Sequence, residues 1–192
     1  MEDLPLSKAV IRRDMRSRRR ALPASKRQQA AEAVTRQLAS LALWQRARRI
    51  AVYHANDGEI DPTPLVRDLR RAGKTPYLPI IQTDSSLRFA AWEADQPLID
   101  NRFGIPEPGG KSLPASALDI ILLPLVAWDL RGNRLGMGGG FYDRALESAA
   151  DVIKMGLAYD CQQLPALPSQ PWDVPLDFVV TESALYQCQG HT

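Results

Sequence analysis

The sequence predicts an α/β fold, with a three-layer, mostly parallel sheet and helices on both faces. Short apolar runs that suit buried strands alternate along the chain with amphipathic segments that suit helices. The chain has 192 residues, of which 45% are hydrophobic and 24% charged, which is ordinary for one globular core. No internal repeat interrupts the alternation. We therefore expect a single Rossmann-like domain over residues 1–192.

The expected helices begin and end at recognisable signals. They are expected at about residues 7–22, 25–43, 61–72 and 141–149. Pro23 breaks the first helix, and Ser25 or a neighbour is expected to cap the second. Gly73 follows the third helix as its stop signal.

The expected strands are short apolar runs between these helices. They cover residues 49–53, 75–81, 86–92, 119–126, 152–159 and 178–180. The most apolar run is Asp119–Val126, which is expected to be a central strand that nears its end at Pro124. Residues 100–114, rich in Gly and Pro, and residues 161–175, rich in Pro, are expected to be loops.

The charge of the chain is unevenly distributed. Residues 1–50 carry a net charge of +9 and the remainder −7, giving +2 overall. The basic N-terminal part, residues 1–45, is expected to be helical and to pack on the α/β core. Such a segment suits nucleic acid or a polyanionic small molecule. Because no aromatic-interleaved RNA motif accompanies it, we expect a small-molecule partner and no nucleic acid.

Two further features concern the compartment. No run of about 18 apolar residues and no signal-peptide pattern occur, so we expect no membrane partner. Two cysteines are too few for a disulfide framework. We therefore expect a cytoplasmic protein, either a monomer or a weak homo-oligomer.

A glycine-rich turn is the strongest functional signal. Residues 133–144 read Asn-Arg-Leu-Gly-Met-Gly-Gly-Gly-Phe-Tyr-Asp-Arg, between a buried strand and a helix. Glycines permit positive φ and close approach of backbone amides, and amides at a helix N-terminus attract anions. With Arg134 as an added charge, the turn is a candidate phosphate site. A flexible turn without a ligand is the alternative.

Two established phosphate motifs do not fit this chain. The pattern G-x-G-x-x-G would need glycine where Phe141 stands. The Walker pattern fails at Gly110-Lys111-Ser112, because its first glycine falls on Ile105. A transferase or isomerase that binds a sugar phosphate without ATP remains an alternative function.

Residues Arg134 to Arg144 resemble the signature of the 5-formyltetrahydrofolate cyclo-ligase family. That signature is Arg-Leu-Gly-x-Gly-x-Gly-(Tyr/Phe)-Tyr-Asp-Arg after a strand that ends in proline, and Met137 and Gly139 occupy its variable positions. Phe141 stands where many members have tyrosine.

Other segments resemble the family in the same order along nearly the whole chain. They are Lys8–Arg12, Tyr53-His54 with Glu59, Leu78-Pro79, Phe103–Pro108, and Pro175–Asp177 with Thr181-Glu182. Trp172 departs from the pattern, since many members have histidine there, and no role is assigned to Trp172-Asp173.

The resemblance implies that ATP and 5-formyltetrahydrofolate are converted to 5,10-methenyltetrahydrofolate, ADP and phosphate, with Mg²⁺ present. The γ-phosphoryl group would pass to the formyl oxygen, nitrogen 10 would attack, and phosphate would leave. Such a reaction needs alignment and neutralisation of charge more than a nucleophilic side chain. The absence of a Ser-His-Asp set or a reactive-cysteine motif agrees with this.

The resemblance also implies roles for individual residues. Catalysis is assigned to Arg134 and Asp143. ATP binding is assigned to Lys8, Ala9, Val10, Ile11, Arg12, Arg134, Leu135, Gly136, Met137, Gly138, Gly139, Gly140, Phe141 and Tyr142. Folate binding is assigned to His54, Glu59, Met137, Gly138, Gly139, Gly140 and Phe141, and Mg²⁺ binding to Asp143 and Asp177.

The residues themselves leave several of these roles open. Lys8 and Arg12 lie four apart on one helical face, where charges are usually solvated, and only the resemblance favours a role for them. The other arginines of this helix are expected to be solvated: Arg13, Arg16, Arg18, Arg19 and Arg20. Asp143 also suits a helix N-terminus, and Glu59 an ordinary loop. The pair Phe141-Tyr142 also suits the core.

Overall fold

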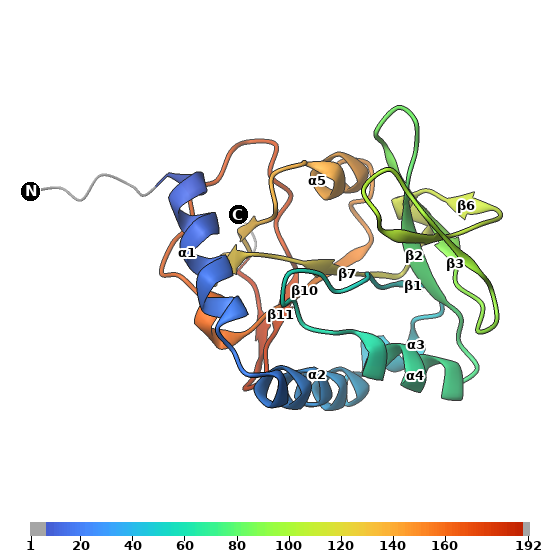
Figure 1. Cartoon of the computed structure of the whole chain (residues 1–192), viewed down its shortest axis with the longest axis horizontal. Helices are drawn as coiled ribbons and strands as arrows, with labels where there is room; N and C mark the ends of the chain where they lie inside the picture. Colours follow the sequence, from blue (N-terminus) through green and yellow to red (C-terminus); the bar gives the residue numbers. More distant parts are fainter. Residues whose placement is uncertain (1–6, 190–192) are drawn as a thin grey trace, which may run out of the picture.

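An eight-stranded sheet forms the centre of the molecule, in a computed structural model that describes residues 7–189 (Figure 1). Its strands are β1 (Ile50–Ala51), β2 (Pro76–Ile81), β3 (Leu87–Ala91), β6 (Ser112–Leu113), β7 (Ile120–Pro124), β10 (Ile153–Leu157), β11 (Phe178–Val180) and β12 (Leu185–Gln187). Their order across the sheet is β12-β11-β10-β7-β1-β2-β3-β6. The strands from β11 to β2 run parallel, which confirms the mostly parallel α/β prediction.

The antiparallel parts of the structure were not all expected. β12 pairs with β11, β3 with β2, and β6 with β3, all antiparallel. Two small hairpins, β4 (Leu98–Asp100) with β5 (Pro106–Pro108) and β8 (Ala127–Trp128) with β9 (Arg134–Leu135), complete the strands. The prediction of a loop throughout residues 100–114 was therefore wrong in part. Proline is tolerated there because β5 is an edge strand.

The helices follow the expected order with shifted ends. They are α1 (Lys8–Arg20), α2 (Ala24–Ala39), α3 (Ala42–Arg46), α4 (Thr63–Arg71) and α5 (Phe141–Leu146), with short 3₁₀ turns η1 (Ala115–Ala117) and η2 (Asp160–Gln162). The second expected helix is divided into α2 and α3. Ser25 lies inside α2 and does not cap it, because Pro23 is the N-cap residue and no side chain bonds there.

The two faces of the sheet bury different side chains. Along β7, Ile120 and Leu122 belong to one apolar core, with side chains of α2 and α4. Ile121 and Leu123 belong to a second core, which includes Leu146 of α5. Figure 1 shows α2, α3 and α4 below the sheet and α5 above it. Buried on both faces, β7 is the central strand that its apolar sequence predicts.

The chain order changes direction at the centre of the sheet. From β1 the chain continues to β2 on one side, whereas β7, β10 and β11 follow on the other side. Ligands of open α/β sheets bind beyond the carboxyl ends of the strands at such a switch point. Residues that follow β1 and β7 are therefore placed where a ligand site is expected.

Among residues 7–189, none of the helices combines the length and apolarity needed to cross a bilayer. Cys161 and Cys188 are free thiols.

Candidate active site

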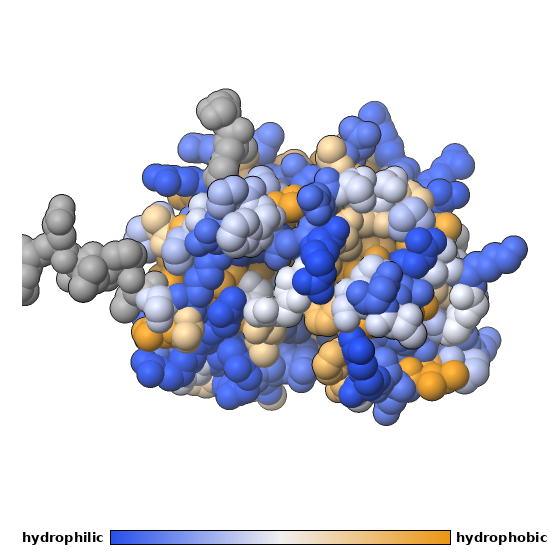
Figure 2. All heavy atoms as spheres, turned by 90° about the horizontal axis from the view of Figure 1, so that it is seen from above, coloured by the Kyte–Doolittle hydropathy of each residue, from blue (hydrophilic) through white to orange (hydrophobic). Residues whose placement is uncertain are grey.

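A cavity of about 640 Å³ opens beside the carboxyl ends of β1, β2 and β7. Its walls come from the start of α1, the residues after β1, β2 and the start of β3, the β4–β5 hairpin, the end of β7, the glycine-rich turn and the loop of Trp172 and Asp173. Figure 2 views the molecule from the α5 side, where hydrophobic atoms lie in depressions between hydrophilic side chains. The cavity therefore combines apolar and charged surfaces.

The first turn of α1 brings two cations to the glycine-rich turn. Ser7 caps the helix by accepting a hydrogen bond from the Val10 amide. Lys8 and Arg12 line the cavity. The Arg12 Nε donates to the Gly136 carbonyl at 2.9 Å, and Lys8 Nζ lies 2.9 Å from Asp173 Oδ2. Two residues that the sequence placed on one helical face thus lie together at the cavity.

The glycine-rich turn presents a row of backbone donors. The N–H groups of residues 136–143 donate no hydrogen bond to any residue between 7 and 189. Gly138 and Gly140 have φ values of 108° and 64°, which side chains disfavour, and Gly140 is the residue before α5. All residues of this segment line the cavity. The turn has the local chemistry of an anion site.

A buried ion pair stands at the base of the turn. Arg134 Nη2 lies 2.7 Å from Asp143 Oδ1, and the Arg134 side chain is 6% exposed. A second hydrogen bond joins Arg134 to the Val174 carbonyl. Burial lowers the pKa of Arg134, and the Asp143 carboxylate opposes that effect. Asp143 keeps Oδ2 without a hydrogen-bond partner among the described residues.

Glu59 lines the cavity from the segment that follows β1. Its side chain is 9% exposed and accepts a hydrogen bond from the Asn56 amide at 3.0 Å. Burial raises the pKa of the Glu59 carboxyl. Burial also raises the pKa of Tyr142, and the neighbouring Glu59 charge adds to that effect. A buried acid and a phenol thus face the same space.

His54 and Tyr53 line the cavity beside Glu59. The His54 ring packs edge-on against Trp92 with centroids 5.3 Å apart, and its Nε2 is buried without a partner among the described residues. Burial lowers the pKa of His54, which favours the neutral ring. Tyr53 donates through its hydroxyl to the Ile60 carbonyl at 2.8 Å.

Four predicted site residues do not reach the cavity. Of the residues between Lys8 and Arg12, Ala9 and Val10 are absent from the cavity wall, and Ile11 is buried in a small core with Met15. They stabilise or continue the helix instead of contacting a ligand in the cavity.

Asp177 is the fourth of these residues. It precedes β11, at the amino end of that strand, whereas the cavity opens at the carboxyl ends of the strands. Its Oδ2 lies 3.3 Å from Lys154 Nζ. Asp143 lines the cavity and Asp177 does not, so the structure does not place the two aspartates of the expected magnesium site on one cavity wall.

The prediction that the remaining α1 arginines are solvated was wrong for Arg19, which is completely buried, and in part for Arg16, which is 34% exposed. Both form ion pairs with Asp57, which supplies the countercharge. Arg20 also pairs with Asp57 but is 55% exposed. Arg13, at 75% exposure, behaves as predicted.

Other residues of the wall were not assigned from the sequence. Asn101 Nδ2 donates to Glu107 Oε1 at 2.6 Å across the β4–β5 hairpin, and both line the cavity. Phe103 and Trp172 also line it and are 56% and 70% exposed. The only signal for this wall in the sequence was the segment Phe103–Pro108 that resembles the family.

Comparisons with known proteins agree with this geometry. The 5-formyltetrahydrofolate cyclo-ligase family matches residues 6–182. The chain is 43% identical to the 5-formyltetrahydrofolate cyclo-ligase of Haemophilus influenzae, over 86% of this chain and 92% of that protein. It is 39% identical to the Escherichia coli K12 protein of the same name, over 90% of this chain and 99% of that protein.

Solved structures give the same result at the level of the fold. The NMR structure of Aquifex aeolicus 5,10-methenyltetrahydrofolate synthetase matches with a TM-score of 0.86 and 31% identity, over 97% of this chain and 95% of that one. A synthetase of the same name from Mycoplasma pneumoniae, 23% identical, has the same fold, with a TM-score of 0.76. This chain belongs to the 5-formyltetrahydrofolate cyclo-ligase family and is an enzyme of the ligase class.

Proposed function

We propose that this protein converts 5-formyltetrahydrofolate and ATP into 5,10-methenyltetrahydrofolate, ADP and phosphate. The observation that carries the proposal is that one cavity has two chemically different walls. One wall holds free backbone amides and four cations, Lys8, Arg12, Arg134 and Arg144, and the other holds a buried carboxyl among aromatic and apolar side chains. A polyphosphate suits the first wall and a pterin suits the second.

The nucleotide phosphates are assigned to the glycine-rich turn. The free amides of residues 136–143 offer donors to phosphate oxygens, and Lys8, Arg12 and Arg134 supply positive charge. Because Lys8 and Arg134 already face Asp173 and Asp143, their side chains are oriented before a nucleotide arrives.

The chemistry of the same wall suits a magnesium ion bound together with ATP. No three carboxylate, His or Cys side chains converge within residues 7–189. Mg²⁺ commonly uses one or two carboxylates with phosphate oxygens and water, and Asp143 fits this role through its free Oδ2. When bound, the ion would neutralise charge on the phosphates. Asp177 is left out of this proposal because it lies elsewhere.

The pterin is assigned to the wall with Glu59. An ionised Glu59 can accept hydrogen bonds from N–H groups of the ring, and His54, Phe141 and Tyr142 supply apolar surface beside it. The neutral His54 adds no competing charge to this wall.

The proposed reaction passes through a phosphorylated formyl group. The formyl oxygen attacks the γ-phosphorus and the bond from that phosphorus to the ADP oxygen breaks. Nitrogen 10 then attacks the formyl carbon and loses its proton, and phosphate leaves with the former formyl oxygen and takes up that proton as hydrogen phosphate. The chain's residues align the two substrates and stabilise the charge on the moving phosphoryl group, with Arg134 closest to that role.

The proposal also covers the fold description, the cellular location and the class of partner. The Rossmann-like, three-layer description is supported by the position of the cavity at the switch point between β1 and β7. A cytoplasmic location is supported by the two free cysteines. The pairing of Arg16 and Arg19 with the buried Asp57 carboxylate favours a small-molecule partner over nucleic acid.

The direct test uses purified protein, 5-formyltetrahydrofolate, Mg²⁺ and ATP. We expect absorbance of the methenyl product to rise only when all components are present, with one ADP formed per product. Omitting ATP is the control for uncatalysed cyclisation. A protein that forms no product, but binds a sugar phosphate, would refute the proposal in favour of a phosphosugar enzyme.

A further inference from the structure

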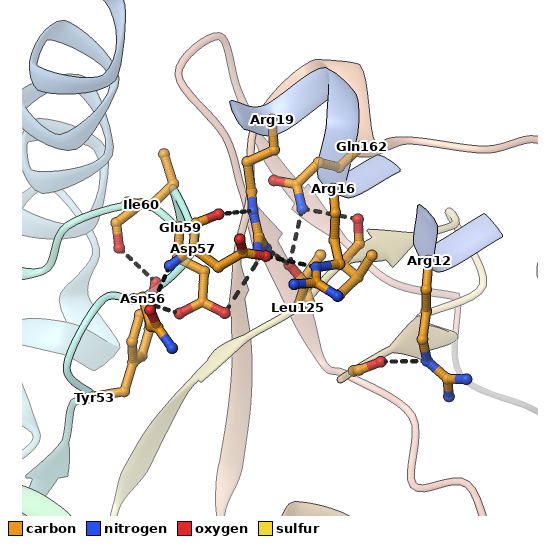
Figure 3. A network of polar contacts seen from close by, with 12 residues as sticks. Arg12, Arg16, Arg19, Tyr53, Asn56, Asp57, Glu59, Ile60, Leu125 and Gln162 are labelled. Carbon is orange, nitrogen blue, oxygen red and sulfur yellow. Dashed lines mark hydrogen bonds and ion pairs between the residues drawn. The ribbon is translucent and has the colours of Figure 1, made fainter. Parts of the chain in front are cut away.

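The turn that carries Glu59 is held by the last two turns of α1. Asp57 lies in this turn, and its carboxylate, with a side chain 9% exposed, forms ion pairs with Arg16, Arg19 and Arg20. Figure 3 shows Arg16 and Arg19 beside it. Arg16 Nε lies 2.6 Å from Asp57 Oδ2 and Arg19 Nη2 lies 2.9 Å from the same oxygen. One carboxylate needs only one cation to balance its charge, so three cations around Asp57 are more than charge balance requires.

Arg19 differs from the other two arginines because its side chain is fully buried. Its Nε donates to the Asp57 carbonyl at 3.0 Å and its Nη1 donates to the Leu125 carbonyl at 3.0 Å. The same Nη1 lies 3.8 Å from Glu59 Oε1. Figure 3 shows this guanidinium between the turn and Leu125. Arg19 therefore contacts the turn, Glu59 and the end of β7 at once.

The Leu125 carbonyl is fixed from a second direction. Gln162, which is 1% exposed, donates through Nε2 to the Leu125 carbonyl at 2.8 Å and to the Val126 carbonyl at 2.9 Å. The acceptor that Arg19 uses after β7 is thus held in place. A rigid acceptor gives the Arg19 guanidinium a defined position relative to the cavity.

The turn itself has an unusual backbone. Asp57 and Gly58 have φ values of 53° and 78°, and the Glu59 amide donates to the Asn56 carbonyl at 3.0 Å. Positive φ at both central residues is strained for a residue with a side chain such as Asp57. A Cβ on Gly58 would lie 3.7 Å from Arg19 Cγ, so the turn packs directly on the arginine. Contacts from α1 therefore stabilise this conformation.

We infer that Arg19 is a positioning residue that fixes Glu59 in the cavity and keeps a positive charge beside its carboxylate. The inference rests on the proposed function, in which Glu59 contacts the folate. Because the first turn of α1 carries Lys8 and Arg12, the same helix places the nucleotide cations and, through Arg19, the folate carboxylate.

The charges around Glu59 define what Arg19 contributes. Arg16 and Arg19 face it from α1 and Asp57 from its own turn, while the hydroxyl groups of Tyr53 and Tyr142 lie nearby. Burial raises the pKa of Glu59, and the positive charge of Arg19 opposes that effect. Loss of Arg19 would therefore leave Glu59 protonated up to a higher pH.

The test compares Arg19→Met with Arg13→Met, which removes an exposed arginine from the same helix. For each, kcat/KM for 5-formyltetrahydrofolate is measured against pH, and KM for ATP at one pH. We expect Arg19→Met to raise KM for the folate about tenfold or more, with KM for ATP within about twofold. The acid limb of the profile, which is the fall of kcat/KM for the folate at low pH, should move to higher pH. Arg13→Met should resemble the wild type.

A folded Arg19→Met protein with unchanged folate KM and an unmoved limb would overturn the inference. Arg19→Lys, which keeps the charge but not the three-donor geometry, should leave the limb near its wild-type position while folate KM still rises. If Arg19 only stabilised the fold, Arg19→Lys would not raise folate KM while leaving the pH dependence unchanged.

Asp57→Asn provides a second route if Arg19→Met does not fold, because asparagine tolerates positive φ. Removing the Asp57 charge should move the acid limb to lower pH, and a limb that stays or moves upward contradicts the inference. A wild-type enzyme without ATP-dependent turnover would refute the proposed function, and the inference with it. Wild-type turnover with unaltered variants refutes the inference alone.

Discussion

Single residues of the cavity owe their chemistry to their surroundings. Glu59 is 9% exposed beside a buried arginine, and Arg134 is 6% exposed beside Asp143. The local sequence around Glu59 is equally typical of a loop acid, and only the resemblance to the family assigned it to the folate, while no sequence signal showed that Arg134 is buried. Burial makes both stronger partners for a ligand, since hydrogen bonds to charged groups gain strength where water is excluded.

At the residue scale, Glu59→Gln should weaken folate binding without affecting ATP. The amide keeps the shape but loses the charge, so we expect KM for 5-formyltetrahydrofolate to rise by roughly ten- to a hundredfold, as for loss of a charged hydrogen bond of about 1.5–3 kcal/mol. KM for ATP measured in parallel is the control. An equal rise in both would contradict the assignment of Glu59 to the folate wall.

The same residue predicts a pH dependence. Glu59 must be ionised to accept from the pterin, so kcat/KM for the folate should fall as pH falls through the pKa of this carboxyl. Because burial raises that pKa, the fall should begin at a higher pH than for an exposed glutamate. In Glu59→Gln this acid limb should disappear; a limb that persists would have to come from another group.

At the scale of elements, the glycine-rich turn connects β9 to α5 and depends on backbone conformation. Gly138 has a φ of 108°, and a Cβ there would lie 3.5 Å from the Arg12 guanidinium. Side chains rarely adopt this conformation. The turn and the start of α1 are therefore one unit, although more than a hundred residues separate them in the sequence.

Gly138→Ala should consequently raise KM for ATP by about tenfold, because a strain of about 1–2 kcal/mol shifts the amides and Arg12 away from their present positions. Gly109→Ala is the matched control, since Gly109 has no positive φ and open space around its Cα. Isothermal titration with a non-hydrolysable ATP analogue measures the effect directly. Equal affinities of the two variants would argue against a phosphate role for the turn.

At the scale of the whole molecule, a buried core position on the central strand and the residues of the cavity wall are expected to have different roles. Leu122 is fully buried on β7 in the core below the sheet and is not part of the cavity wall, although Tyr53 belongs to both. A substitution at Leu122 should therefore act on folding and leave the substrate constants unchanged.

Leu122→Ala tests this separation. We expect the free energy of unfolding to fall by about 2–5 kcal/mol, because a large side chain is removed from a fully buried position. Leu130→Ala, at a side chain 48% exposed, should change it by less than about 0.5 kcal/mol. Urea unfolding measures both. A large change in KM for either substrate in the folded Leu122→Ala protein would contradict the separation.

The sequence predicted much of the fold because its signals are local. The apolar run of β7, the helices α1 and α4, and the order of elements follow from periodicity and from Pro and Gly punctuation. The edge strands β4, β5, β6 and β12 were not predicted. They have three residues or fewer and form through pairing with distant segments, which leaves little trace in a short window.

For the candidate site, the sequence predicted most of the segments that the structure brings to the cavity. The glycine-rich turn, Lys8 with Arg12, and Glu59 were named from motifs and from their resemblance to a family, and all line one cavity. Free backbone amides follow from glycine content at a strand-to-helix turn, which is a local property. Membership of the family could also be predicted from the sequence, because the motif from Arg134 to Arg144 consists of consecutive residues.

Only the tertiary structure decided which charges meet. Arg19 is buried beside Asp57 and Glu59, whereas Asp177 pairs with Lys154 outside the cavity that Asp143 lines. Charge partners far apart in the sequence are set by how strands and helices pack, and no local pattern encodes that distance. Burial, which decides whether such a pair is strong, arises only when the whole chain has folded.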